Sequence, residues 1–420
     1  MGKTMTEKIL ARASGREDVA VGDIVTVRVD LAMANDVTGP LVLRQLSKAG
    51  VTKVFDPERI CIVAGRHAPF RDVALANEVA QLAAFCEAQG IRHFYGHGEG
   101  MDHALVQELG LVRPGMLICN ADSHACTVGA LGAFAAAMGS TDMAYIFAFG
   151  ETWLQVPPTI LVRYRGKPDR FITSKDFVLA ALGRLGVDGA QYKSLEFSGE
   201  ALTALSMDER FTITNMAIEM GAKTGMIQPD EVTNEFLSTR TNLPFLPVRS
   251  DSDAALEKVI DIDVSHLPPL VAKPHLPSNV VPVKELRGVK VTQVNIGSCT
   301  NGRIIDLEQA ASILQGKKVA KGVRLIVTPA TEIVYRQALA NGLLEIFTEA
   351  NAIINPPGCG PCAGWHMGVL AAKDVCMATH NRNFLGRMGH KDAQIYLSNP
   401  YVAAATAIAG VIIDPQEVTP

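Results

Sequence analysis

The sequence predicts an α/β protein with mostly parallel sheets, built from more than one domain. Three observations carry this prediction. Short apolar runs at residues 60–64 and 116–119 alternate with amphipathic helical patterns such as residues 74–90, which is the order of elements expected of parallel sheets. A similar alternation returns after a proline-rich segment at residues 264–283. The 420 residues are also too many for one ordinary hydrophobic core.

The alternation predicts three domains joined by one linker. The expected divisions are residues 1–157 and 158–263 for two α/β domains, 264–283 for an extended linker with five prolines, and 284–420 for a third α/β domain. Further strands are expected at residues 159–164, 291–296, 323–328 and 352–355, and further helices at residues 174–183 and 330–340. Because open parallel sheets bind ligands at the carboxyl ends of their strands, the loops after these strands are the first candidates for a site.

The composition indicates a globular protein without nucleic-acid or membrane partners. Hydrophobic residues make up 48% of the chain and its formal net charge is −4, so no basic surface for nucleic acid is expected. The longest apolar stretch, residues 130–149, contains Ser140, Thr141 and Asp142, which favours a buried strand and helix over a membrane span. Eight cysteines without a signal peptide predict a reducing compartment. The cytoplasm is the expected location.

Three cysteines lie in loops rich in glycine, proline and asparagine. Cys299 is alone, whereas Cys359 and Cys362 form a C-x-x-C pair. Thiolates are the usual ligands of iron–sulfur clusters, and a four-iron cluster held by three cysteines keeps one iron open as a Lewis acid. A structural zinc would need a fourth ligand, for which His366 is the near candidate. The C-x-x-C pair alone would also suit a redox dithiol, so spacing leaves three alternatives open.

Four longer stretches identify a resemblance to the aconitase superfamily. They are NIGSCTNGR at residues 295–303, NPPGCGPC at 355–362, NRNFLGRMG at 381–389 and ADSHACTVGALGAF at 121–134. The resemblance implies three α/β domains around a central iron–sulfur site, without the swivelling fourth domain of that superfamily. It also implies a [4Fe-4S] cluster with one open iron, held by Cys299, Cys359 and Cys362.

The same resemblance supplies candidate site residues. It implies catalytic roles for His67, His103, Asp122, His124 and Glu219, and substrate binding by Asn35, Asp36, Arg66, Ser123, Asn215, Arg382 and Arg387. An arginine suits a substrate carboxylate because its guanidinium group donates two parallel hydrogen bonds. Ordinary structural roles compete with these: Asp122 or Ser123 would also cap a helix, and a single histidine after a strand is more often structural. Asn215 and Glu219 would share one face of a helix.

Arg66, Ala104 and Ala378 depart from the superfamily pattern, and the first two have a clear counterpart there. Arg66 stands where an aspartate usually precedes the histidine, and Ala104 stands where a glutamine commonly follows His103. Both departures fall on the substrate side of the expected site and not on the cysteines. They bear on the identity of the substrate more than on the cofactor.

The resemblance implies the large, cluster-binding subunit of a hydro-lyase. Its substrate would be a hydroxy di- or tricarboxylic acid, and the chain length resembles the isopropylmalate dehydratase large subunits of leucine biosynthesis. Homoaconitase, 2,3-dimethylmalate and maleate/citraconate hydratase large subunits are alternatives. A cluster-bearing regulator without catalysis, a zinc-stabilised structural protein and a degenerate paralogue are alternatives of other classes. Because the chain ends at Pro420, a separate small subunit carrying the swivelling domain is the expected partner.

Overall fold

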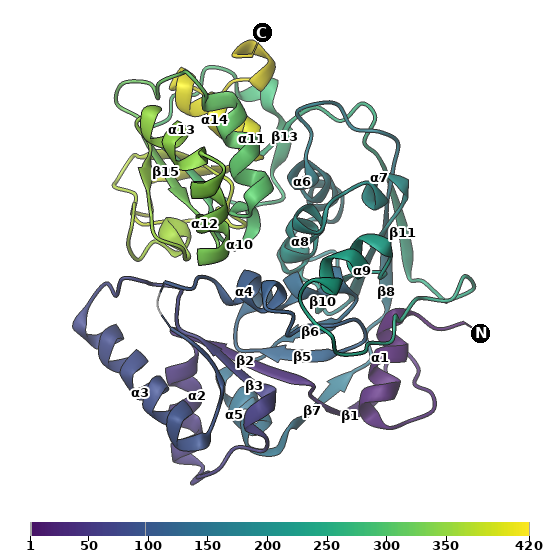
Figure 1. Cartoon of the computed structure of the whole chain (residues 1–420). Coiled ribbons are helices and arrows are strands. Elements are labelled where there is room, and N and C mark those ends of the chain that lie inside the picture. The colour runs from purple at the N-terminus through teal and green to yellow at the C-terminus, as the bar shows by residue number, and fades with distance from the viewer. Residues whose placement is uncertain (1, 97, 420) are drawn as a thin grey trace.

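The computed structural model describes residues 2–96 and 98–419. Its first sheet, of five strands, and its second sheet, of four strands, are entirely parallel (Figure 1). The five-stranded sheet has the order β4-β3-β2-β5-β6. It comprises β2 (Leu31–Asn35), β3 (Ile60–Val63), β4 (His93–Tyr95), β5 (Leu117–Asn120) and β6 (Phe134–Ala137). The four-stranded sheet has the order β10-β9-β8-β11. It comprises β8 (Thr159–Arg165), β9 (Ser194–Ser198), β10 (Thr224–Ile227) and β11 (Lys258–Asp263).

The third sheet has seven strands in the order β13-β12-β18-β17-β14-β15-β16. It comprises β12 (Leu270–Ala272), β13 (Val280–Pro282), β14 (Gln293–Gly297), β15 (Arg324–Thr328), β16 (Ile353–Ile354), β17 (Val375–Ala378) and β18 (Gln394–Leu397). The five strands from β18 to β16 are parallel, and β12 and β13 add an antiparallel edge. A separate antiparallel pair joins β1 (Ile24–Arg28) and β7 (Glu151–Gln155). The predicted mostly parallel α/β fold is therefore confirmed.

The proline-rich segment at residues 264–283 differs from its expectation. It was predicted as an extended linker, yet it supplies β12 and β13 to the edge of the third sheet. An edge strand tolerates proline because one side of its backbone has no neighbouring strand to accept a hydrogen bond. The predicted division into three domains with a linker remains a proposal.

Helices connect these strands along the chain. They are α1 (Met5–Ser14), α2 (Gly39–Lys48), α3 (Val73–Gln89), α4 (Asp102–Glu108), α5 (Ser140–Phe149), α6 (Ser174–Leu185), α7 (Glu200–Thr203), α8 (Met207–Asn215), α9 (Glu231–Ser238), α10 (Ser298–Asn301), α11 (Ile304–Leu314), α12 (Glu332–Ala340), α13 (Leu343–Glu349) and α14 (Pro400–Ala409). The glycine predicted to end the helix at residues 74–90 does so, since Gly90 caps α3 with a φ of 72°. No helix in the described part of the chain is long and apolar enough to cross a membrane.

The continuous apolar runs of the first sheet follow from burial on both faces. Along β3, Ile60 and Ile62 belong to one hydrophobic cluster, whereas Cys61 and Val63 belong to another. The second cluster continues through the four-stranded sheet to Ala378 in β17. Packing therefore joins the three sheets into one body, and Figure 1 shows α4 below α10 where the first and third regions meet.

The segment around Asn215 is not the continuous helix expected from its spacing. The helix α8 ends at Asn215, and a 3-10 turn, η3 (Met216–Met220), follows it up to Gly221, whose φ is 83°. The tighter turn changes the angle between Asn215 and Glu219, so the two side chains reach different partners. Asn215 approaches Cys299, and Glu219 approaches His124.

Candidate functional site

A cavity of about 160 Å³ lies where the first and third sheets face each other. The residues that line it follow the carboxyl ends of β2, β3, β4 and β5 in the first sheet, and of β14, β16 and β17 in the third. They are Val37, Arg66, Met101, His103, Asp122, Ser123, His124, Cys299, Cys359, Cys362, Ala363, Trp365, Asn381, Arg382 and Arg387. The structure thus brings together ten of the fifteen residues predicted for the site.

The three loop cysteines converge on this cavity. Cys299 lies in the short helix α10 directly after β14, and Cys362 lies in the 3-10 helix η5 (Gly360–Ala363) after β16. Each of the three side chains is buried, and together with Met101 they form one small cluster. Asn215 and Asn381 donate amide hydrogens toward Cys299 Sγ over 3.5 and 3.6 Å. Amide donors of this kind stabilise negative charge on sulfur.

Glycine lets the C-x-x-C loop run close to its neighbours. Gly360 has a φ of 57°, and a Cβ atom there would lie 2.6 Å from Thr328 Oγ1. The Cys359 amide donates to the Arg66 carbonyl over 3.0 Å, which ties this loop to the first sheet. Three buried thiols on tight turns, with amide donors around them, are a donor set that fits an iron–sulfur cluster.

The thiols have different pKa values because they lie side by side. Burial, and then the neighbouring Cys362, raise the pKa of Cys299 to about 11. A hydrogen bond shared by Cys359 and Cys362 raises the pKa of Cys359 and lowers that of Cys362. Metal binding deprotonates such thiols, so a bound metal would remove protons from this site.

The two alternatives to a cluster gain no support from the geometry. His366, the fourth ligand considered for zinc, does not line the cavity and packs against the His67 ring at 5.1 Å between centroids. A redox dithiol would need only Cys359 and Cys362, yet Cys299 shares their cavity. The histidines and carboxylates in the rest of the site contact one another instead.

His103, Asp122 and Arg66 form a chain of charged contacts. His103 Nε2 lies 2.7 Å from Asp122 Oδ1, and Arg66 Nη1 lies 2.8 Å from Asp122 Oδ2. Asp122 also accepts from the His124 amide over 3.1 Å as the cap of a 3-10 helix, so its expected capping role and its site role coexist. Burial raises the pKa of Asp122, but Arg66 and His103 outweigh burial and hold that pKa well below its ordinary value.

A second chain of contacts runs through Glu219. Its Oε1 atom lies 2.9 Å from His124 Nε2 and accepts from Arg382 Nε over 2.7 Å. Arg387 differs from Arg382, because its guanidinium group contacts Cys362 Sγ at 3.9 Å and forms no ion pair with a carboxylate among the described residues. Arg387 is therefore the cation in this cavity with the most capacity for an added carboxylate.

Five predicted residues lie behind the cavity. Asn215 and Glu219 reach the lining residues as described, and Asn35 donates to Asp102 over 3.3 Å. Asp36 accepts from the His67 amide over 3.0 Å and lies 3.3 Å from His67 Nδ1. Trp365, which lines the cavity, packs against the His67 ring at 4.8 Å between centroids. The catalytic role predicted for His67 remains a prediction.

The sequence analysis missed three residues that lie in the site or support it from behind. Asp102 is buried beside Arg66, and Asn381 hydrogen-bonds near Cys299. Lys175 is fully buried and donates to Asn301 Oδ1 and to the carbonyls of Thr379 and His380 over 2.7–3.0 Å. Burial lowers the pKa of Lys175 to about 7. The clue to Asn381 was its place beside Arg382, whereas Lys175 looked like an ordinary helix residue.

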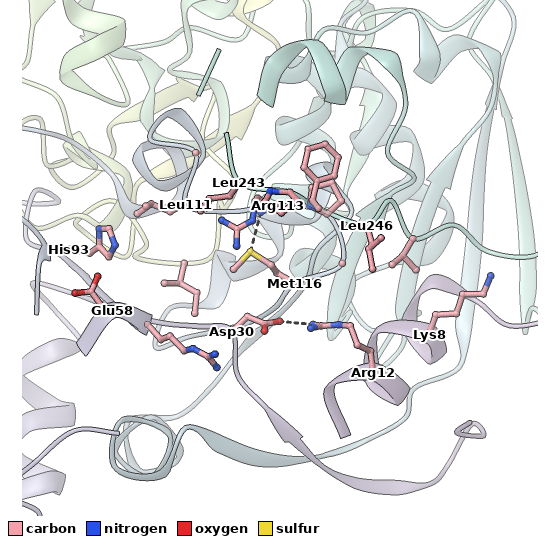
Figure 2. Close-up of a pocket in the computed structure, with 18 residues that line it drawn as sticks. Lys8, Arg12, Asp30, Glu58, His93, Leu111, Arg113, Met116, Leu243 and Leu246 are labelled. Atoms are coloured by element: carbon pink, nitrogen blue, oxygen red, sulfur yellow. Dashed lines mark hydrogen bonds and ion pairs between the residues drawn. The ribbon is translucent and has the colours of Figure 1, made fainter. Parts of the chain in front are cut away.

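A larger cavity, of about 850 Å³, lies at the opposite edge of the first sheet. It is lined by residues at the amino ends of β2, β3, β4 and β5, including His93 and Met116 (Figure 2). Its charged side chains are mostly paired with protein groups, as Arg12 is with Asp30 at 2.5 Å. Because it lacks convergent catalytic groups and sits at the amino edge, the smaller cavity is the candidate site.

The fold and the cavity define an α/β protein with a three-thiol site opposed by histidine–carboxylate pairs and arginines. The sequence profile of the Aconitase family (aconitate hydratase) matches residues 7–288 and 283–410. The chain belongs to the aconitase family. Membership implies an iron–sulfur cluster, which the cysteine geometry fits.

Curated relatives match the chain from end to end. The 3-isopropylmalate dehydratase large subunit 1 of Pyrococcus furiosus is 51% identical, and the alignment covers 99% of both chains. The 3-isopropylmalate dehydratase large subunit of Aquifex aeolicus is 50% identical over 100% of this chain and 98% of that one. Among solved structures, the holo-form of aconitase X from Thermococcus kodakaraensis has a TM-score of 0.52, with 15% identity and 87% coverage of each chain. That likeness supports the fold alone.

Proposed function

We propose that this chain is the cluster-binding large subunit of a hydro-lyase that converts 3-isopropylmalate in leucine biosynthesis. The single observation that carries the proposal is the convergence of three buried cysteines, two histidine–carboxylate pairs and Arg387 on one cavity. The relatives named 3-isopropylmalate dehydratase large subunit, about 50% identical over the whole chain, support the choice of substrate.

The proposed cofactor is a [4Fe-4S] cluster held by Cys299, Cys359 and Cys362. When bound, it would supply a Lewis-acidic iron with a position open to the substrate. Asn215 and Asn381 would donate hydrogen bonds to the thiolate of Cys299. Gly360 would let the loop wrap the cluster, since a side chain there would meet Thr328.

The chain's own residues account for binding and for one of the two proton movements. Arg387 would take a substrate carboxylate, and Arg382, held by Glu219, would orient a second polar group. His103 or His124 would donate a proton to the departing hydroxyl group, which leaves as water, while the paired carboxylate stabilises the charged imidazole. Rehydration reverses these transfers. The apolar lining from Val37, Met101 and Trp365 suits a branched hydrocarbon substituent.

The carboxylates at the cavity, Asp122 and Glu219, are each paired with a histidine and an arginine, which makes them weak bases for the proton next to the substrate's carboxylate. We therefore infer a separate small subunit that carries the swivelling domain and supplies the base for that proton when it closes over the cavity. The designation of the relatives as large subunits supports a partner of this kind. The isolated large chain is then expected to have little or no activity.

The test is turnover by the large chain reconstituted anaerobically with iron and sulfide and with its small subunit. The panel holds isopropylmalate, homocitrate, citrate, dimethylmalate, citramalate and malate, and the ultraviolet absorbance of the conjugated double bond reports dehydration. Turnover of isopropylmalate that requires both subunits is the expected result. Preference for another acid would overturn the substrate, and silence with a loaded cluster would overturn the enzymatic function.

A further inference from the structure

Arg66 occupies the position where the superfamily pattern has an aspartate, and the structure shows what it contacts. Its Nη1 atom lies 2.8 Å from Asp122 Oδ2, and its Nη2 atom lies 3.3 Å from Asp102 Oδ1. Its Nε atom is buried and has no acceptor among the described residues. Both amino groups of the guanidinium group therefore face protein carboxylates.

Asp102 is fixed from the other side. It is the first residue of α4, with its side chain 1% exposed, and its Oδ2 atom accepts from Asn35 over 3.3 Å and from Asn120 over 3.1 Å. These two asparagines end β2 and β5. Asp102 is thus anchored to the rigid edge of the first sheet, and it holds Arg66 there.

The local charges decide what Arg66 can do. Both amino groups of Arg66 already face protein carboxylates, so this guanidinium group has little capacity left for a substrate carboxylate. Arg387 forms no ion pair with a carboxylate among the described residues, so its guanidinium group is the better partner for one. His103 Nε2 lies 2.7 Å from Asp122 and 3.6 Å from Asp102, which makes its position depend on how Arg66 holds these two aspartates.

We propose that Arg66 and Asp102 form a positioning pair that holds Asp122, and through it His103, toward the cavity. Arg66 is then a positioning residue and not a ligand for the substrate, in contrast to the role that the family resemblance implied. This inference deepens the proposed function and rests on it for its kinetic test. His67, the next residue, is held separately by Asp36, which accepts from its amide and lies 3.3 Å from its Nδ1 atom.

The test is a double-substitution cycle with Arg66→Met, Asp102→Asn and both together, in the cluster-loaded protein. Removing Arg66 leaves two buried carboxylates unneutralised, so kcat is expected to fall about 100-fold with KM changed less than about threefold. Asp102→Asn leaves Arg66 paired with Asp122, and a loss of only about threefold is expected. The kcat of the double variant is expected to be about tenfold higher than that of Arg66→Met, because only one unneutralised carboxylate then remains.

The opposite result is equally specific. If Arg66 binds a substrate carboxylate, Arg66→Met raises KM, and Asp102→Asn does not restore activity. A higher KM with no recovery in the double variant overturns the proposal. Arg92 and Glu58, an exposed pair 3.3 Å apart with side chains 79% and 55% exposed, provide the matched control. Arg92→Met and Glu58→Gln should leave turnover unchanged, since exposed pairs contribute little.

A second readout separates this proposal from the function itself. The unfolding temperatures of the same cluster-loaded variants are expected to be non-additive, with the double variant more stable than Arg66→Met. If the unsubstituted complex converts no acid in the panel, the proposed function fails and this unfolding cycle alone decides on the pair. Additive unfolding temperatures overturn the pair whatever the activity.

Discussion

The two walls of the cavity are built in different ways. The cysteine wall, formed by Cys299, Cys359 and Cys362, comes from tight loops of the third sheet, where glycine and proline set the backbone path. The polar wall, formed by Arg66, His103, Asp122 and His124, comes from the first sheet, where side chains hold one another through ion pairs. One wall depends on local backbone geometry, whereas the other depends on partners distant in sequence.

This difference separates two kinds of sensitivity to substitution. A cysteine contributes a ligand that no neighbour replaces, so its loss removes the cofactor itself. A member of the polar wall contributes charge and orientation, and its loss is partly compensated when its partner is also changed. The comparison therefore predicts all-or-none effects on one wall and graded, coupled effects on the other.

The largest effect is expected for Cys299→Ser. Serine is a poor substitute for a thiolate ligand, so iron and acid-labile sulfide per chain should fall and turnover should drop by about 1,000-fold or more. Metal and sulfide analysis together with the dehydration assay measure both. Cys86→Ala is the control, because Cys86 is equally buried but lies in α3, away from the cavity. A full cluster in the Cys299→Ser variant would contradict the assignment of the cysteine wall.

Arg387→Met is expected to rank second. Arg387 lies beside Cys362, yet its predicted role is to bind a substrate carboxylate with its positive charge. The substitution therefore tests whether the arginine acts on the substrate or on the cofactor. Without the guanidinium group that binds the substrate's carboxylate, kcat/KM should fall about 100-fold, mainly through a higher KM. The cluster content should stay unchanged. Arg336→Met, at an exposed arginine paired with Glu332, should change neither. Loss of iron from Arg387→Met would show that Arg387 supports the cysteine wall instead.

Glu219→Gln probes the carboxylate behind the polar wall that contacts both His124 and Arg382. Glutamine keeps the size of the side chain but removes the charge that faces both His124 and Arg382. A loss of about 10- to 100-fold in kcat is expected, because the orientation and charge of both groups change at once. Comparing kcat for Glu219→Gln with that of Arg382→Met and of the double variant measures the coupling. Purely additive losses would contradict a shared network.

The same contrast explains how much of the site could be predicted from the sequence. The cysteine wall was predicted in full, because ligand and supporting glycines lie within a few residues of each other. On the polar wall, Asp122 and His103 were predicted from their motifs, but Asp102 was missed. Its partners Asn35 and Arg66 lie 67 and 36 residues away, and nothing in the local pattern marks it as more than a helix start.

The fold shows the same limit at the level of elements. Buried strands such as β3 were predicted closely, because burial on both faces leaves a continuous apolar run. The edge strand β13 and its neighbour β12 were missed, because the prolines in and around them look like linker residues. The role of Lys175 was missed for a related reason, since its acceptors Thr379 and His380 lie more than 200 residues away.

The smallest effect is expected on substrate selectivity, through an apolar residue that lies beside the polar wall. Val37 lines the cavity after β2. In Val37→Ala the pocket loses apolar contact with a branched substituent. The kcat/KM for isopropylmalate, divided by that for the analogue with a methyl group in place of the isopropyl group, should therefore fall about 10-fold. Val42→Ala is the matched control, because Val42 is fully buried in α2 and does not line the cavity. It should lower the unfolding temperature without altering the ratio. An unchanged ratio in Val37→Ala would place selectivity on the partner subunit, so the polar wall of this chain would govern the chemistry without selecting the substituent.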